Sequence, residues 1–395
     1  MKEEDEDGGG DEAMMVTETE GFWVEGNKRV RTKAWDSRTP TALTFAESSL
    51  CPRHYTSTFA GRSHLHIFGE CSDLGKVAIS SLLRSLPSDS SRAEIVSLVR
   101  WNRDDSLVTK TVELSSVLLL SSTLRSAEEW RASAEIPASW VDGRKVLRSL
   151  QRTCPDLASL SVLSLLDDTS PRFAEVERSL LEFENSVAVT QLKVGVLHCR
   201  DGQVNERDMY SNCDPSESFL HFLDFLGKPF TAEKEESKYN GGLHRGQRGM
   251  RGVWGDIEFI FHVSSLLPFD AEVGSQQIER KRHLGNDTIM IVFVEGSHEI
   301  SPATFRSKVN QIFIFVRASP CGTYHIQIAS KCEVEYFGPS VPVEEEFCFV
   351  LDENMRNFLF EKIVRGHKAA YHCPKYAHYW YARQEKLVTC LKDFF

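Results

Sequence analysis

The chain has 395 residues, of which 41% are apolar and 26% are charged, a composition typical of a globular protein of two or three domains. Its formal net charge is −11, and an acidic balance argues against nucleic acid as the main partner. No apolar run approaches the length of about 18 residues that a transmembrane helix needs, so we expect peripheral membrane recruitment at most.

The first segment of the chain is strongly acidic. Residues 2–20 carry nine acidic side chains against Lys2 alone, with three consecutive glycines, and this predicts a disordered tail over residues 1–20. The tail lacks the apolar stretch of a secretory signal. The ten cysteines are scattered without a C-x-x-C pair, as is typical of reduced thiols in an intracellular protein. We therefore expect a cytoplasmic protein.

Residues 21–186 predict a mainly β domain. The apolar patch Gly21–Gly26 should anchor its start. Three segments have the alternation or the β-branched content of strands, namely residues 64–69, 93–100 and 107–112. Residues 126–131 are helical in propensity.

Residues 187–395 predict an α/β domain with a central mixed sheet flanked by helices, which makes the whole chain α+β. The expected strands are residues 192–197, 257–263, 289–294, 312–317 and 324–328. One helix should begin at Asp214 as its N-cap and end at Gly227. Pro302–Val309 should separate two of the strands, and helices at Asn354–Lys368 and Lys375–Leu391 should complete the chain.

A polar helix is expected at Gln276–Leu284, directly before the strand at residues 289–294. Only Ile278 and Leu284 are large and apolar, which predicts a mostly solvated helix. Gly285 and Asn286 tolerate a left-handed backbone and should end it. From the residues alone, Asn286 is a turn residue and the cations of the helix are a solvated basic face.

The run Arg-Lys-Arg-His-Leu-Gly-Asn-Asp at residues 280–287 resembles the signature of the Rap/Ran GTPase-activating domain family, most closely its Rap-directed members. Further landmarks follow the order of the family: residues 193–196, 218–219 with 225–227, 241–243, 261–264 with 266–268, and 337–339. The resemblance spans the second half of the chain nearly end to end. The first half loosely resembles the dimerisation domain of Rap-directed activators, and this implies a possible homodimer.

The resemblance implies that Asn286 is a catalytic residue supplied in trans, which orients the water that attacks GTP on a small GTPase. His283, one turn earlier, is expected to support this asparagine or to contact the GTPase. The implied GTPase-binding residues are Arg280, Lys281, Arg282, Asp287, Arg245 and Arg248. GTP and Mg²⁺ belong to the partner, so the chain needs no cofactor and activates a hydrolase without being one.

The chain departs from the family at residues 244–252, where an Arg- and Gly-rich segment follows Gly241-Gly242-Leu243 in place of an aspartate and a longer turn. This segment is either a mobile loop or a basic rim that docks an acidic GTPase surface. The substrate is expected to be Rap in its GTP form. The alternatives are activation of Ral or Rheb, or a GTPase-binding scaffold without catalysis.

No other catalytic or metal site is predicted. The chain lacks a G-x-x-x-x-G-K-[ST] phosphate-binding loop, so it is not itself a nucleotidase of that class. Two His/Cys groups lack the paired spacing of zinc ligands. They are Cys51, His54, His64, His66 and Cys71, and His372, Cys373 and His378.

Overall fold

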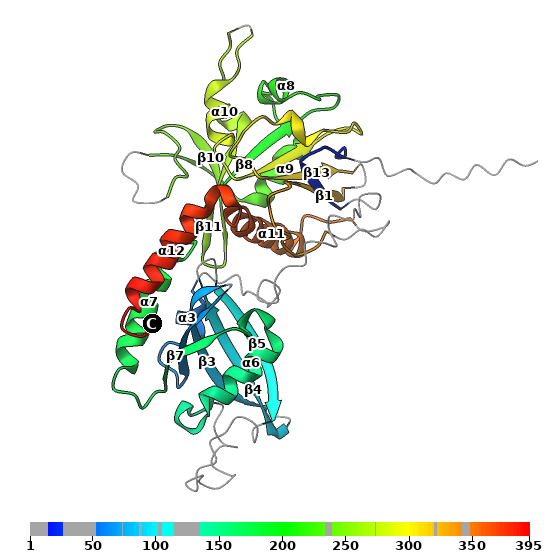
Figure 1. The fold of residues 1–395 in the computed structure, drawn as a ribbon. Helices are drawn as coiled ribbons and strands as arrows, with labels where there is room; N and C mark the ends of the chain where they lie inside the picture. Colours follow the sequence, from blue (N-terminus) through cyan, green and yellow to red (C-terminus); the bar gives the residue numbers. More distant parts are fainter. Residues whose placement is uncertain are drawn as a thin grey trace, which may run out of the picture. The chain divides into compact units, whose positions relative to one another are not determined.

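The computed structural model describes residues 15–26, 53–72, 74–86, 89–101, 105–113, 135–233, 239–272, 274–319, 322–341 and 348–395. These residues form two compact units (Figure 1). One unit draws on residues 1–38 and 191–370 and contains an eight-stranded sheet; the other draws on residues 39–190 and 371–395 and contains a six-stranded sheet. Among the described helices, none combines the length and the apolar character needed to cross a membrane.

The eight-stranded sheet is mixed, as expected. Its order is β1 (Phe22–Glu25), β14 (Tyr324–Lys331), β13 (Ile312–Ala318), β12 (Ile289–Val294), β8 (Gln191–Cys199), β11 (Ile257–Val263), β10 (Arg248–Trp254) and β9 (Lys228–Thr231). The four central strands β13, β12, β8 and β11 are parallel, and the outer pairings are antiparallel. All six residues of β12 are buried because parallel strands are covered on both faces.

Helices cover both faces of this sheet. On one face, α8 (Glu206–Tyr210) and α10 (Ile278–Leu284) add Met209 and Leu284 to a core that contains Val292 of β12. On the other face, the ring of Phe222 in α9 (Glu217–Leu226) lies 5.3 Å from that of Phe293. Phe360 of α11 (Glu353–Tyr371) packs at 4.7 Å on Phe259. The expected sheet flanked by helices is therefore confirmed.

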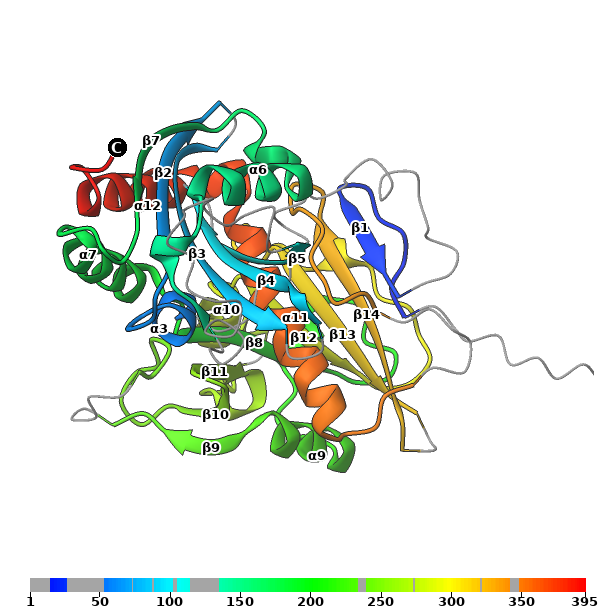
Figure 2. The same cartoon turned by 90° about the horizontal axis from the view of Figure 1, so that it is seen from below.

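The amino-terminal segment differs from the expectation at residues 15–26. Met15 and Val16 are buried in the core of the eight-stranded unit, and β1 pairs with β14, beside which it lies in Figure 2. The buried carboxylate of Glu25 accepts a 2.6 Å bond from Lys362 of α11. The patch at residues 21–26 thus belongs to the sheet predicted from the second half of the chain. Residues 1–14 of the expected disordered tail lie outside the described residues.

The six-stranded unit is mainly β, with the sheet order β5 (Asp105–Glu113), β4 (Asp89–Arg100), β3 (Gly75–Leu86), β2 (Leu65–Cys71) and β7 (Ser161–Leu166), and with β6 (Glu135–Ile136) paired to β3. Helix α6 (Gly143–Thr153) packs on one face. The other face carries α3 (His54–Thr58), α7 (Phe173–Val187) and α12 (Ala377–Cys390). The last helix of the chain therefore packs in this unit, whereas the sequence placed it in the α/β domain. The helix expected at residues 126–131 lies outside the described residues.

Three local expectations are wrong. Helix α9 begins after Ser216, whose side chain accepts the backbone N–H of Phe219, so the N-cap is Ser216 and not Asp214. Pro302–Val309 forms only a short 3₁₀ turn at Pro302–Thr304. Part of the segment at 244–252 is strand β10, which pairs with β9 and β11. For β10, pairing with neighbouring strands outweighs the local residue preference.

Candidate functional site

Helix α10 begins at an unusual backbone position. Gln277 is its N-cap and has φ of 51°, the sole positive φ among the described residues other than glycine. A non-glycine residue in this region costs free energy and persists only where its surroundings hold it. Gln277 is buried, and its carboxamide bonds both the N–H and the C=O of Asp270, at 3.0 and 2.7 Å. These two hydrogen bonds fix the start of the helix.

The buried face of α10 is largely polar, which corrects the expectation of a solvated helix. Arg280 is only 1% exposed, while the apolar Ile278 is 71% exposed. Nη1 of Arg280 donates to the carbonyl oxygens of Tyr210 at 2.7 Å and Asn212 at 2.8 Å. Nε and Nη2 donate to the carbonyl of Leu267 at 3.4 and 3.3 Å. Arg280 therefore anchors the helix and is not positioned to contact a partner.

The end of α10 is set by close packing. Gly285 has an ordinary right-handed φ of −70°, so the expected left-handed backbone is absent there. A Cβ on Gly285 would lie 2.5 Å from the carbonyl oxygen of Lys281, which explains the glycine. Gly195 of β8 serves a similar purpose, because a Cβ there would lie 3.3 Å from Cγ of Leu284 and 3.4 Å from Oδ2 of Asp287. The helix end therefore lies directly against the central sheet.

Asn286 follows this helix end and is exposed. Its carboxamide has no hydrogen-bond partner among the described residues, although the backbone around it is firmly held. The side chain of Asn310 donates to the carbonyl oxygens of Leu284 and Asp287, and Ser307 Oγ donates to that of Gly285 at 2.6 Å. A free amide thus projects from a rigid junction.

Asp287 holds the other side of the junction. Its side chain is fully buried. Oδ2 lies 2.8 Å from Nδ1 of His262 in β11, and Oδ1 lies 3.5 Å from the ammonium of Lys193 in β8. Because Asp287 is buried, it is a positioning residue and cannot contact a partner directly. A buried carboxylate needs such partners to remain charged.

His283 lies between α10 and the neighbouring loop. It is 7% exposed, and its ring centroid is 5.3 Å from that of His262. Burial, together with His262 and Arg282, lowers the pKa of His283 to about 4, so the ring is neutral at pH 7. The flanking cations point elsewhere: Lys281 lies 5.6 Å from the ring centroid of Tyr210, and Arg282 bridges the exposed Glu279 at 2.8 Å.

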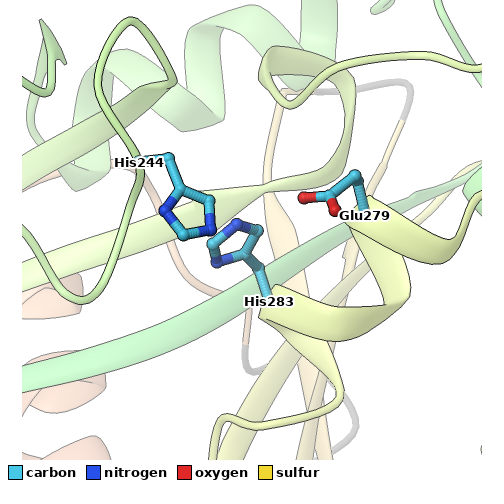
Figure 3. Close-up of side chains that lie close together, drawn as sticks. All are labelled: His244, Glu279 and His283. Atoms are coloured by element: carbon cyan, nitrogen blue, oxygen red, sulfur yellow. The ribbon is translucent and has the colours of Figure 1, made fainter.

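The segment before β10 meets α10 at the same place. The ring centroid of His244 is 5.9 Å from that of His283. His244, Glu279 and His283 each offer a metal-ligating atom, and these atoms lie within 4.8 Å of one another (Figure 3). Arg245 and Arg248 are exposed beside them, at the end of the loop and the start of β10. The structure thus brings Arg245, Arg248, His283 and Asn286 to one region.

The sequence did not identify the residues that support this region. Ser307 and Asn310 had no signal, because the backbone groups they contact are distant in sequence. Lys193 and His244 lie within the landmark at residues 193–196 and the segment at residues 244–252, but neither was assigned a role. Among the described residues, the two His/Cys groups considered from the sequence do not converge on a shared point that could hold a metal. The rings of His64 and His66 pack edge to face, with their centroids 4.5 Å apart.

Comparison with known proteins places this region in a family. Residues 209–387 match the Rap/ran-GAP family model, and this span contains α10 and Asn286. Residues 209–387 are therefore a Rap/Ran-GAP family domain. The chain is 32% identical over 346 residues to human signal-induced proliferation-associated protein 1, covering 85% of this chain and 31% of that protein. It is 37% identical over 212 residues to human GTPase-activating Rap/Ran-GAP domain-like protein 3, covering 51% of this chain and 20% of that protein.

The chain spans less than a third of the length of these relatives. One solved structure, described as that of the TSC2 GAP domain, is 25% identical and covers 46% of this chain and 96% of its own, with a TM-score of 0.37.

Proposed function

We propose that this chain is a GTPase-activating protein that accelerates GTP hydrolysis on a Rap-type small GTPase by supplying Asn286 in trans. The observation that carries the proposal is the exposed, unpartnered carboxamide of Asn286 on a rigidly held backbone within a matched Rap/Ran-GAP domain. The names of the similar proteins, which include signal-induced proliferation-associated protein 1, support activity of this class without identifying the substrate.

The chemistry of the carboxamide suits the task. Hydrolysis requires a water molecule held in line with the γ-phosphate of GTP. A carboxamide offers one acceptor oxygen and an NH₂ donor, and it is neutral, so it can orient water without removing its proton. Such positioning is effective only if the group itself is fixed. Ser307 and Asn310 bond the backbone on both sides of Asn286 and provide that rigidity.

The exposed residues around Asn286 supply the docking surface in this proposal. Lys281, Arg282, Arg245 and Arg248 would pair with acids of the GTPase, and such exposed charges mainly raise the rate of association. GTP and Mg²⁺ remain with the partner. His283 is neutral and packs beneath this surface, where it supports the end of α10.

The test is single-turnover phosphate release from GTP-loaded Rap, with Ral and Rheb in parallel. Asn286→Ala should slow the stimulated rate roughly 100-fold or more while affinity for the GTP form persists. Gln276→Ala is the matched control because Gln276 is an exposed carboxamide near the other end of α10. Binding of all three GTPases without acceleration would instead identify a scaffold.

A further inference from the structure

Two histidines and one glutamate converge from two segments next to Asn286. Glu279 and His283 are four residues apart on α10, so they project from the same face of the helix. His244 reaches them from the loop that precedes β10, and Figure 3 shows the three side chains turned toward one another. Their ligating atoms lie within 4.8 Å of one another.

The burial of His283 points independently to a ligand. Its side chain is 7% exposed, and its Nε2 is buried with no hydrogen-bond partner among the described residues. A buried polar atom of this kind carries a free-energy cost unless something else binds it. The ring is held between His262 on one side and His244 on the other. An added ligand at Nε2 would remove this cost.

The donor set indicates the class of ligand. Two imidazoles and a carboxylate are the ligands of three-coordinate zinc sites that keep a fourth position open. Ligands of tetrahedral zinc lie about 3.3 Å apart, so the group must contract by about 1.5 Å at most. Contraction is feasible because the side chains of His244 and Glu279 are exposed, while His283 is buried and held in place. The Arg282 bridge uses Oε2 of Glu279, which leaves its other oxygen for a cation.

We propose that His244, Glu279 and His283 bind a divalent transition-metal cation, with Zn²⁺ as the representative, and that this cation blocks access to Asn286. The bound cation joins the loop before β10 to α10, since His244 lies on that loop and Glu279 and His283 lie on the helix. It also places positive charge and bound water beside the surface that the GTPase would meet. Mg²⁺ and Ca²⁺ do not compete, because they prefer sites built from oxygen ligands.

Cation binding is tested directly by calorimetric titration of the full chain with ZnCl₂. The wild type should bind one equivalent at this site, and His244→Ala and Glu279→Gln should each weaken that binding at least about tenfold, as expected when one of three ligands is lost. His221→Ala is the matched control, since His221 is an exposed histidine on α9. Absence of zinc binding, or equal affinity in His244→Ala, would overturn the proposal.

Co²⁺ gives a second readout of the ligand set. Bound to nitrogen and oxygen atoms, it should show visible absorption without the strong near-ultraviolet band of cobalt–thiolate bonds. Among the residues that the structure describes, the exposed thiols of Cys213 and Cys332 are competing cation ligands. A thiolate band that persists in His244→Ala would assign the cation to them and refute the site.

The inhibitory role rests on the proposed GTPase activation, so it is measured separately. Stimulated GTP hydrolysis is compared with and without Zn²⁺ within each variant, and the GTPase alone controls for zinc bound to the partner. Zinc should slow the wild-type reaction at least about tenfold and the His244→Ala reaction far less. Zinc binding without any effect on a working activator would refute inhibition alone. A chain that binds zinc but activates no GTPase would refute the proposed function and leave the site intact.

Discussion

Replacing Arg280 tests whether this residue anchors α10 or contacts the GTPase. The structure assigns it to anchoring, because its guanidinium is 1% exposed and donates to three backbone carbonyl groups. Arg282, two residues along the same helix, is the matched comparison. Its side chain is 42% exposed, and its one described bridge is to Glu279.

The expected magnitudes differ widely. Arg280→Ala removes two short bonds from a charged group, to Tyr210 and Asn212, and leaves buried carbonyl oxygens without donors. Each such loss costs about 1.5–3 kcal/mol, so the free energy of unfolding should fall by about 3–5 kcal/mol. For a unit of this size the melting temperature should fall by roughly 10 °C. Arg282→Ala removes only an exposed i,i+3 ion pair, worth about 0.2–0.5 kcal/mol, and should leave the melting temperature nearly unchanged.

Scanning calorimetry measures the stability of both variants, and binding to GTP-loaded Rap is measured below their melting temperatures. Arg280→Lys should be intermediate, because a compact ammonium lacks the planar, forked set of donors with which the guanidinium reaches three separate carbonyl groups. The reasoning would be refuted if Arg280→Ala melted within about 2 °C of the wild type yet lost affinity for the GTPase. That result would mean that Arg280 leaves its carbonyl groups and binds the partner.

Three further outcomes are expected. Asp287→Asn removes the charge that pairs with His262 and Lys193, and chemical denaturation should show a loss of about 1–3 kcal/mol, while Asn286→Ala should show almost none. Burial holds the pKa of His66 well below its usual value, so the unfolded chain takes up a proton near pH 6.5 that the folded chain does not. Lowering the pH from 7.5 to 5.5 should therefore cost up to about 1.4 kcal/mol, and His66→Phe should abolish this part of the pH dependence of unfolding. If the chain dimerises, the edge strand β7 is the expected interface because Leu163 on it is 50% exposed; light scattering should then show a dimer that Leu163→Lys dissociates, and a wild-type monomer would exclude it.

The strands of the central sheet could be predicted where burial and residue type agree. β11 and β12 have the predicted bounds, because runs of β-branched and aromatic residues suit strands buried on both faces. β10 could not be predicted, since its arginines and glycines are typical of a loop. Its Gly252 is required by the approach of α9, where a Cβ would lie 2.6 Å from the carbonyl oxygen of Leu226. That contact joins residues far apart in the chain.

The candidate site also depends on contacts between residues that are far apart in the chain, which the sequence alone does not reveal. The position of Asn286 followed from a motif, but its rigidity depends on Ser307 and Asn310, which no local pattern marks. Hydrophobic periodicity also misjudged α10, because the buried position 280 is occupied by arginine and the exposed position 278 by isoleucine. A helix can bury a charged side chain only when carbonyl groups elsewhere in the chain accept its hydrogen bonds. A single sequence does not reveal those acceptors.

The polar attachment of α10 has a physical advantage if Asn286 positions water as proposed. Apolar packing fixes the distance between elements but constrains rotation and sliding weakly, whereas hydrogen bonds are directional. Gln277 at the start of the helix and Arg280 in its middle bond backbone groups of other segments, and Asn310 bonds a carbonyl group at its end. Asp287 bonds His262 of the sheet. Each bond resists a different motion of the junction. The backbone of Asn286 is therefore held in orientation as well as in place, and this suits the proposed role of its carboxamide in holding water for in-line attack on a phosphate.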